Sequence, residues 1–264
     1  MNSTVELVDS HCHLDFESFD EDREQVLANA AEAGIKRLIN PGINLETSER
    51  AVALAQQYRG VYAAVGYHPY DASEINGESL TALSQLTEQP KVVAIGEIGL
   101  DYYRDRAPRV DQIRAFEAQL DLAKSLELPV IIHQREAAAD TMAILRRWGA
   151  GRNHPGLVLH AFSGDEKMVE EAVALGFYIG IGGPITFKNA KGLPDIVQAI
   201  PLSHMIIETD APFLSPHPYR GKRNEPARLA LIAQKLAHLF GLSLEVLAGR
   251  FRRNTEALFH LPTT

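Results

Sequence analysis

Side chains that can bind a metal ion stand at the ends of several short apolar runs in this chain. The residues that end or directly follow such a run are His11, His13, Glu97, His133, His160 and Asp210. If the runs are parallel strands of one closed sheet, these side chains meet at one rim, because the carboxyl ends of parallel strands share one side. Imidazoles and carboxylates gathered at one point are costly to desolvate unless a cation shares the site. The pattern therefore predicts a centre that holds a pair of divalent metal ions.

The histidine pair at the amino terminus is weak evidence by itself. His11 and His13 point to the same side of a strand while Cys12 points away, because strand side chains alternate. With 10 histidines in the chain, such a pair also arises by chance in a packed or surface position. The other ligand candidates favour the metal site, because each falls at the carboxyl end of a separate predicted strand, where the active sites of α/β barrels form.

His68 also ends an apolar run, at 61–67, but Pro69 follows it and no coordination position is left vacant for it. We expect His68 to contact the substrate, with metal ligation and simple packing as the alternatives. His204 precedes its strand and is expected at the opposite end of the barrel. Loop or helix-surface positions are expected for His154, His217, His238 and His260.

Strand and helix patterns alternate along the whole chain. The strands are expected at 5–10, 35–40, 61–66, 92–96, 129–133, 157–160, 177–182 and 205–210. Helical periodicity fills the intervals, which favours a parallel sheet, and right-handed crossovers over eight such units close it into a barrel. We predict an α/β fold, a TIM-like (β/α)8 barrel, as a single domain over residues 1–264. An open, doubly wound sheet is the alternative.

Glycines end the seventh predicted strand, where no ligand candidate stands. Gly180, Gly182 and Gly183 indicate that another part of the chain approaches the backbone closely there.

Composition limits the classes of function. A formal net charge of −8 disfavours a protein that coats nucleic acid through a general basic face. It leaves room for an enzyme acting on phosphodiesters, because bound metal would neutralise several acids. No apolar stretch approaches the about 20 residues that span a bilayer, and no secretory signal pattern is present. With a single cysteine, we expect a cytoplasmic protein without membrane contact or obligate protein partner.

Five segments together carry a family resemblance. They are Asp-Ser-His-Cys-His-Leu-Asp at 9–15, Gly-Tyr-His-Pro at 66–69, Gly-Glu-Ile-Gly-Leu-Asp-Tyr at 96–102, His-Ala-Phe-Ser-Gly at 160–164 and Glu-Thr-Asp-Ala-Pro-Phe-Leu at 208–214. In this order, over essentially the whole chain, they resemble the TatD family of metal-dependent hydrolases, a branch of the amidohydrolase-like barrels. The resemblance implies a TIM-like barrel with divalent-metal-dependent deoxyribonuclease activity.

The resemblance also implies how the ligands divide between two ions. It assigns His11, His13, Glu97 and Asp210 to one ion, and Glu97, His133 and His160 to the other, so that Glu97 bridges them. Ala161 stands where many relatives carry a cysteine, but this position is not a proposed ligand.

We therefore expect hydrolysis of DNA phosphodiester bonds by water activated between two ions about 3.5 to 4 Å apart. Asp210 would accept the proton of the attacking water, and Glu97 would be required for catalysis as the shared ligand. Zinc, manganese and magnesium all suit the ligand types. The same centre would also support hydrolysis of an amide, lactone or ester, including an aminoacyl ester on RNA. A barrel that binds metal without catalysis is the third interpretation.

Positive charge follows the last ligand. Arg220, Lys222 and Arg223 lie just past Asp210, where a DNA phosphate could dock, and a solvated loop is the alternative of equal weight. Weaker candidates for substrate contact are Arg135, Lys188, Tyr102 and Tyr103. The tyrosines could stack on bases or simply pack over the barrel rim.

Overall fold

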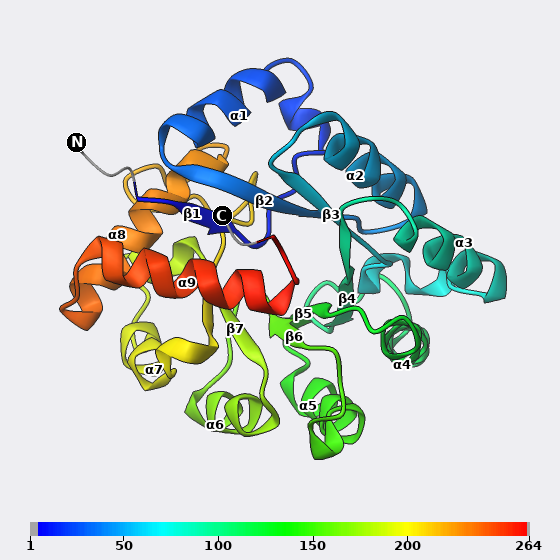
Figure 1. Cartoon of the computed structure of the whole chain (residues 1–264). Coiled ribbons are helices and arrows are strands. Elements are labelled where there is room, and N and C mark those ends of the chain that lie inside the picture. The colour runs from blue at the N-terminus through cyan, green and yellow to red at the C-terminus, as the bar shows by residue number, and fades with distance from the viewer. Residues whose placement is uncertain (1–4, 263–264) are drawn as a thin grey trace.

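Eight parallel strands form one sheet in which each strand pairs with the next along the chain. The structure is a computed structural model that describes residues 5–262. The strands are β1 (Leu7–Asp9), β2 (Ile35–Pro41), β3 (Val61–Val65), β4 (Val92–Asp101), β5 (Val130–Arg135), β6 (Leu157–Leu159), β7 (Tyr178–Ile181) and β8 (Met205–Ile207). Figure 1 shows the strands at the centre of the molecule with the helices around them.

Helices α1 to α7 lie in the connections between strands, and α8 and α9 follow the last strand. They are α1 (Arg23–Glu32), α2 (Leu45–Gln57), α3 (Gly77–Thr87), α4 (Arg109–Ser125), α5 (Ala138–Trp148), α6 (Glu166–Leu175), α7 (Leu193–Ala199), α8 (Leu229–Phe240) and α9 (Leu244–Leu258). Short 3-10 segments occur at Glu17–Phe19, Pro69–Glu74, Ala150–Arg152, Gly183–Thr186, Leu202–His204 and Pro226–Arg228. Within residues 5–262, no single helix is long and apolar enough to cross a bilayer. The segments Pro226–Phe240 and Leu244–Leu258 meet these criteria only when they are taken together, and the chain bends by 113° between them.

Backbone hydrogen bonds join the two ends of the sheet and close the barrel. The Ser10 N–H donates to the Ile207 carbonyl at 3.2 Å, and the Asp210 N–H donates to the His11 carbonyl at 2.9 Å. The His13 N–H in turn donates to the Ala211 carbonyl at 2.7 Å. The segments that follow β1 and β8 therefore run side by side, which rules out the open sheet.

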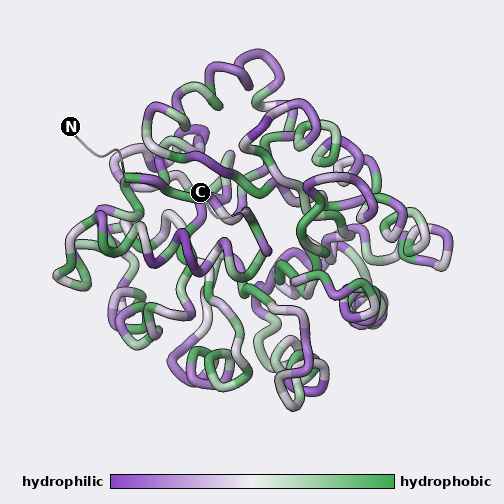
Figure 2. Tube along the Cα trace, in the orientation of Figure 1, coloured by the Kyte–Doolittle hydropathy of each residue, from purple (hydrophilic) through white to green (hydrophobic). Residues whose placement is uncertain are grey.

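The inside of the barrel is filled by alternate strand residues. The inward set that packs together is Val8, Ile39, Ala64, Ala94, Ile131, Val158 and Ile206, with Leu258, Phe259 and Leu261 from the end of α9. Neighbouring strand residues belong to the larger cluster that faces the helices, as the period of two requires. Figure 2 shows this as hydrophobic residues along the strands and polar residues mostly on the outer helices.

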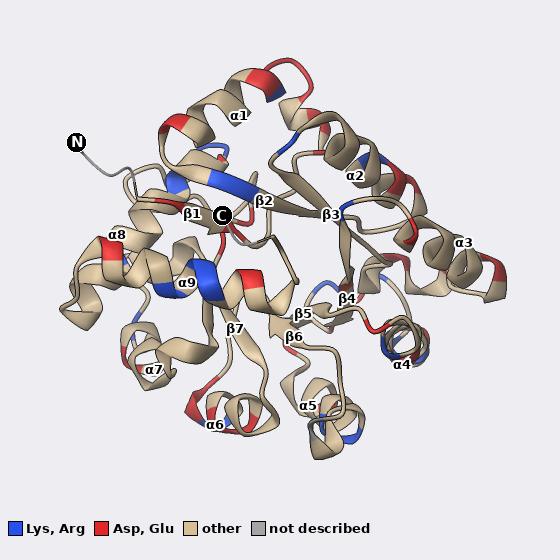
Figure 3. Ribbon diagram, viewed as in Figure 1, with Lys and Arg blue, Asp and Glu red and all other residues tan. Residues whose placement is uncertain are grey.

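A buried ion pair joins α9 to strand β2 at one end of the barrel. The Arg37 guanidinium on β2 contacts the Glu256 carboxylate on α9, and both side chains are 7% exposed. Figure 3 shows a basic segment on β2 and an acidic segment near the carboxyl end of α9. Arg37 precedes the inward-facing Ile39 on β2, so α9 closes the amino-terminal end of the barrel. The carboxyl ends of the strands are left to form a site.

The fold prediction is confirmed as a single-domain TIM-like barrel, but two strands are longer than expected. β4 continues to Asp101 and β5 to Arg135, so Glu97 and His133 lie within strands rather than at their ends. The glycines of β4 suggest a strand end at 96, yet pairing continues because Gly99 lies opposite His133. A Cβ at Gly99 would sit 2.0 Å from the His133 carbonyl oxygen, so glycine is what allows the two strands to approach.

Candidate metal centre

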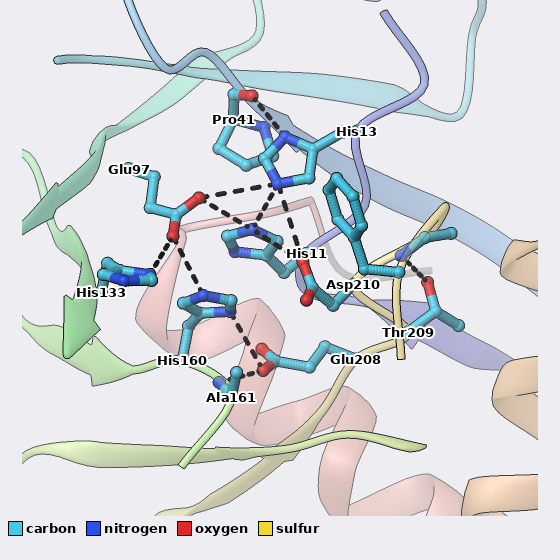
Figure 4. A network of polar contacts seen from close by, with 12 residues as sticks. His11, His13, Pro41, Glu97, His133, His160, Ala161, Glu208, Thr209 and Asp210 are labelled. Carbon is cyan, nitrogen blue, oxygen red and sulfur yellow. Dashed lines mark hydrogen bonds and ion pairs between the residues drawn. The ribbon is translucent and has the colours of Figure 1, made fainter. Parts of the chain in front are cut away.

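All the predicted ligand side chains meet at the carboxyl end of the barrel, as Figure 4 shows. They are buried, apart from the partly exposed His133. Their ligand atoms form three overlapping groups, each within 4.8 Å: His11 with His13 and Asp210, His11 with Glu97 and His160, and His68 with Glu97 and His133. Residues that lie in or directly after six different strands therefore converge on one point.

One side of the site contains the amino-terminal histidine pair. Nε2 of His11 and Nε2 of His13 are 3.1 Å apart, and each lies 3.7 Å from Oδ1 of Asp210. Oε2 of Glu97 is 3.3 Å from the first nitrogen and 3.6 Å from the second. Nitrogen ligands about 2.0 to 2.1 Å from a tetrahedral zinc ion are separated by about 3.3 Å. The spacing of these atoms fits a shared ion.

The other oxygen of Glu97 faces the remaining histidines. Oε1 lies 2.8 Å from Nδ1 of His133 and 3.0 Å from Nε2 of His160. Glu97 thus offers one oxygen to each side, which is the arrangement a bridging carboxylate needs. The two sides of the site are not fully separate, because the His160 ring on one side stacks on the His11 ring on the other, with centroids 3.8 Å apart.

The far nitrogens of three imidazoles face oxygen atoms, as hydrogen bonds for His13 and His133 and as an ion-pair contact for His160. Nδ1 of His13 lies 3.3 Å from the Pro41 carbonyl oxygen. Nε2 of His133 lies 3.0 Å from Oδ2 of Asp101, and Nδ1 of His160 lies 3.3 Å from Oε1 of Glu208. A histidine that binds a metal usually donates its other N–H to such an oxygen. The lone pairs that remain point toward Glu97, so these residues fit a metal centre.

The pKa shifts describe a site that needs positive charge. Burial lowers the pKa of His11 and of His13, which keeps both imidazoles in the neutral form that binds metal. Burial opposes ionisation of Glu97, but the positive charge of His160 holds its pKa well below the ordinary value. Burial also raises the pKa of Asp210 to about 6. A divalent cation would satisfy both carboxylates at once.

Two carboxylates at this site were missed by the sequence analysis. Glu208 accepts hydrogen bonds from the Ala161 N–H and from the Ser10 hydroxyl, and Asp101 accepts from the Tyr70 hydroxyl at 3.2 Å. The position of Glu208, two residues after the inward-facing Ile206, is the signal that could have identified it. Asp101 lies beyond the strand end that was expected.

The glycine-rich end of β7 makes room for one of these carboxylates, as its composition predicted. A Cβ at Gly180 would sit 2.6 Å from Oε2 of Glu208, and one at Gly183 would sit 1.9 Å from the Leu214 carbonyl oxygen. The absence of a side chain at Gly180 therefore leaves space for the Glu208 carboxylate, which faces His160.

Asp9 ties the two strands that carry the first and last ligands. Its carboxylate accepts the Thr209 N–H at 2.9 Å and the Thr209 hydroxyl at 2.5 Å. Burial raises the pKa of Asp9 to about 8 despite these bonds. The contact fixes β1 against β8 directly beneath His11 and Asp210.

His68 lies at the rim with its Nε2 3.7 Å from Oε1 of Glu97. Its Nδ1 accepts the Tyr70 N–H at 3.2 Å. Burial, followed by the charge of His133, lowers its pKa well below the ordinary value, so the ring is neutral. A neutral ring that accepts at Nδ1 carries its proton on Nε2. That geometry favours donation to an oxygen over ligation of an ion.

The basic loop after β8 is partly committed to other contacts. Arg223 donates to both carboxylate oxygens of Asp22, at 2.9 and 2.6 Å, and so ties the loop to the start of α1. Arg220 donates to Asn189 at 2.7 Å, and its guanidinium stands 4.4 Å from the centre of the Phe187 ring. Lys222 is exposed. Arg220 and Lys222 are the members best placed for solvent-side contacts.

An aromatic pocket adjoins the histidine pair. The Phe16 ring packs on the His13 ring with centroids 4.8 Å apart, and Phe213 meets Phe16 edge to face at 5.6 Å. These rings line a 370 Å³ pocket together with Thr47 and Arg50. Phe213 is 48% exposed, so an apolar surface is open beside the centre.

Comparisons with known proteins match almost the whole chain. Residues 8–260 match the family model described as TatD related DNase. The chain is 40% identical over 255 residues to the metal-dependent hydrolase YabD of Bacillus subtilis, covering 97% of this chain and 99% of that one. It is 38% identical over 258 residues to the 3'-5' ssDNA/RNA exonuclease TatD of Shigella flexneri, covering 96% and 98%.

A solved structure shows the same fold. The crystal structure of the TatD homologue YjjV from Escherichia coli superposes with a TM-score of 0.91 at 37% identity, covering 98% of this chain and 100% of that one. The sequence match and the structural match both span the strands that carry the histidines and carboxylates of the centre. The chain therefore belongs to the TatD family of metal-dependent hydrolases.

Proposed function

We propose that this protein is a nuclease that hydrolyses phosphodiester bonds of DNA with two divalent metal ions. The observation that carries the proposal is the position of Glu97, which presents Oε2 to His11 and His13 and Oε1 to His133 and His160. A carboxylate shared in this way is the usual means of holding two ions close together. The relative named as a 3'-5' ssDNA/RNA exonuclease supports a nucleic acid as the substrate.

Two bound cations would supply Lewis acidity at the phosphate and a more acidic water at neutral pH. The chain's own contribution is to hold the ligands rigidly. Pro41 and Asp101 hold the His13 and His133 rings through hydrogen bonds to their far nitrogens. Glu208 lies at ion-pair distance from the far nitrogen of His160. Asp210, at the edge of the site, is placed to take a proton from the attacking water.

Neighbouring residues supply contacts that suit a nucleotide. Nε2 of His68 carries a proton and lies at the rim, where it can donate to a phosphate oxygen. The open ring of Phe213 offers a surface on which a base next to the scissile phosphate can pack. Arg220 and Lys222 add positive charge on the side of the loop after β8. This combination favours a phosphodiester of nucleic acid over a small acyl substrate.

The test uses purified protein stripped of metal with a chelator and then given zinc, manganese or magnesium in steps. Each preparation is assayed on 5′-labelled single-stranded DNA and RNA, and on a panel of carboxyl esters, lactones and amides. We expect DNA cleavage to return as the metal content approaches two ions per chain. The Glu97→Ala variant, prepared identically, controls for contaminating nucleases.

Each contrary result identifies a different error. Metal-dependent hydrolysis of carboxyl substrates without DNA cleavage would replace the proposal with the acyl alternative. Full DNA cleavage in chelator, with no metal detected by elemental analysis, would refute the two-ion centre. A metal-loaded protein that turns over none of these substrates would indicate a binding barrel without catalysis.

A further inference from the structure

Three exposed arginines near the rim of the site stand over tyrosine rings instead of pairing with acids. The guanidinium carbons of Arg135 and Arg104 lie 3.9 and 5.5 Å from the centre of the Tyr103 ring. That of Arg106 lies 4.6 Å from the centre of the Tyr70 ring. Tyr103 is itself 51% exposed. Tyr70, Tyr103, Arg104, Arg106 and Arg135 are termed the arginine–tyrosine patch.

These arginines differ from other exposed arginines in the part of the chain that the structure describes. Arg50, Arg146 and Arg147 each contact a glutamate. Within residues 5–262, no carboxylate lies within ion-pair distance of Arg104, Arg106 or Arg135. Stacking on a ring holds a guanidinium in place while its N–H edges stay free. The patch therefore presents oriented hydrogen-bond donors that the fold does not use.

The patch begins at the metal centre itself. Arg135 lies two residues after His133 on β5, so both side chains leave the strand on the same side. The Tyr70 hydroxyl donates to Oδ2 of Asp101, and this oxygen also lies 3.0 Å from Nε2 of His133. The Tyr70 ring also meets the His68 ring, with centroids 4.2 Å apart. A chain of direct contacts thus links the arginines to the His133 side of the site.

We propose that the arginine–tyrosine patch binds the phosphate backbone of a single-stranded nucleic acid next to the bond that is cleaved. This inference rests on the proposed nuclease function. Guanidinium groups suit phosphate because several N–H donors lie in one plane. Exposed tyrosine rings and guanidinium planes also stack on bases, which are accessible only when unpaired. The patch lies on the His133 side, whereas the pocket of Phe16 and Phe213 adjoins His13, so a strand crossing the centre would reach both.

The neighbouring pair of Arg109 and Tyr102 provides a matched control. Arg109 stands over Tyr102 at 4.1 Å, so its environment resembles that of the patch. Its guanidinium is instead 3.7 Å from Asp105, and the Tyr102 hydroxyl donates to Asp140. Since this pair already has acidic partners, we expect its removal to leave strand binding unchanged.

The binding experiment is done in chelator, where no cleavage occurs. Anisotropy of a fluorescein-labelled 12-nucleotide oligothymidylate gives the dissociation constant between 50 and 200 mM salt. Each phosphate contact on a single strand contributes about −0.7 to the slope of log K against log salt. The triple variant Arg104→Gln/Arg106→Gln/Arg135→Gln should have a salt slope that is shallower by about 2. Between 50 and 200 mM salt, its affinity should therefore fall by about 20-fold less than that of the wild type. Arg109→Gln should match the wild type.

A small substrate separates this inference from the proposed function. The metal-loaded triple variant should lose far more kcat/KM on the oligonucleotide than on bis(p-nitrophenyl) phosphate, which has no neighbouring phosphates for the patch to bind. Circular dichroism and the melting temperature confirm that the variant is folded. An unchanged affinity and salt slope in the triple variant, or no binding by the wild type at 50 mM salt, would overturn the inference. Arginine-dependent binding by a protein that cleaves neither substrate would sustain the strand-binding role of the patch while refuting the nuclease proposal and the position next to a cleaved bond.

Discussion

Glu208 is the residue whose replacement best tests how the centre is supported. Its Oε1 faces Nδ1 of His160 at 3.3 Å and accepts the Ala161 N–H, and its side chain is fully buried. Glu208→Gln retains an oxygen that can accept but removes the charge. Glu208→Ala removes the carboxylate that faces His160 and the acceptor of the Ala161 N–H. The two variants therefore separate the contribution of charge from that of position.

The expected magnitudes follow from these contacts. Removing the partner of a metal-binding histidine typically costs about 10- to 100-fold in metal affinity or activity. Glu208→Gln should fall near the lower value, about 1.4 kcal/mol, because an oxygen still faces Nδ1. Glu208→Ala should fall near the upper value, about 2.7 kcal/mol, since the imidazole loses its fixed orientation as well.

The assay is a titration of metal-stripped protein with zinc or manganese in competition with a chromophoric chelator. Activity at saturating metal then shows whether the loss is confined to binding. Glu171→Gln is the control, because Glu171 pairs with Arg146 on the outer helices. The reasoning is refuted if Glu208→Ala binds metal as tightly as Glu171→Gln while both melt at the wild-type temperature.

Three further predictions concern other parts of the molecule. Glu97→Ala should reduce hydrolysis by more than about 100-fold and lower the metal content measured by elemental analysis, because both sides of the centre lose a ligand; near-normal rates would show that Glu97 is not shared. His68→Gln should lower kcat/KM on DNA by about 100-fold with an unchanged metal content, as expected for loss of a donor to the substrate; a lower content would make His68 a ligand. Glu256→Ala should lower the free energy of unfolding in urea by about 3 to 5 kcal/mol, because it leaves Arg37 buried without its partner; a change below about 1 kcal/mol would contradict this.

The positions of the candidate ligands were predictable because they depend on local pattern. Alternation along a strand places His133 with Ile131 and His160 with Val158, and a parallel barrel brings the carboxyl ends of its strands together. Neither inference requires knowledge of which side chain contacts which. Placing Glu97 at a rim thus succeeded even though β4 runs five residues further than expected.

The partners of those ligands were not predictable from the same pattern. Whether Asp101 contacts His133 depends on the register between β4 and β5, which glycines at 96 and 99 obscure. The basic loop shows the same limit, because residue type alone did not reveal that Arg223 pairs with Asp22, 201 residues away. Charge in a loop indicates what a side chain can bind, and only the fold shows whether a partner already occupies it.

The contacts that stabilise the fold and the residues of the candidate site lie at opposite ends of the barrel. The proposed substitutions can therefore affect one without the other. The amino-terminal end is closed by α9, with Phe259 in the inner core and Glu256 paired to Arg37. The ligands lie at the opposite end, above a layer of apolar side chains that includes Ile131 and Val158. Substitutions at Glu97 or His68 remove polar contacts without opening that layer, so they should change metal content or turnover before they change folding. Glu256→Ala should do the reverse, with normal turnover for each folded molecule.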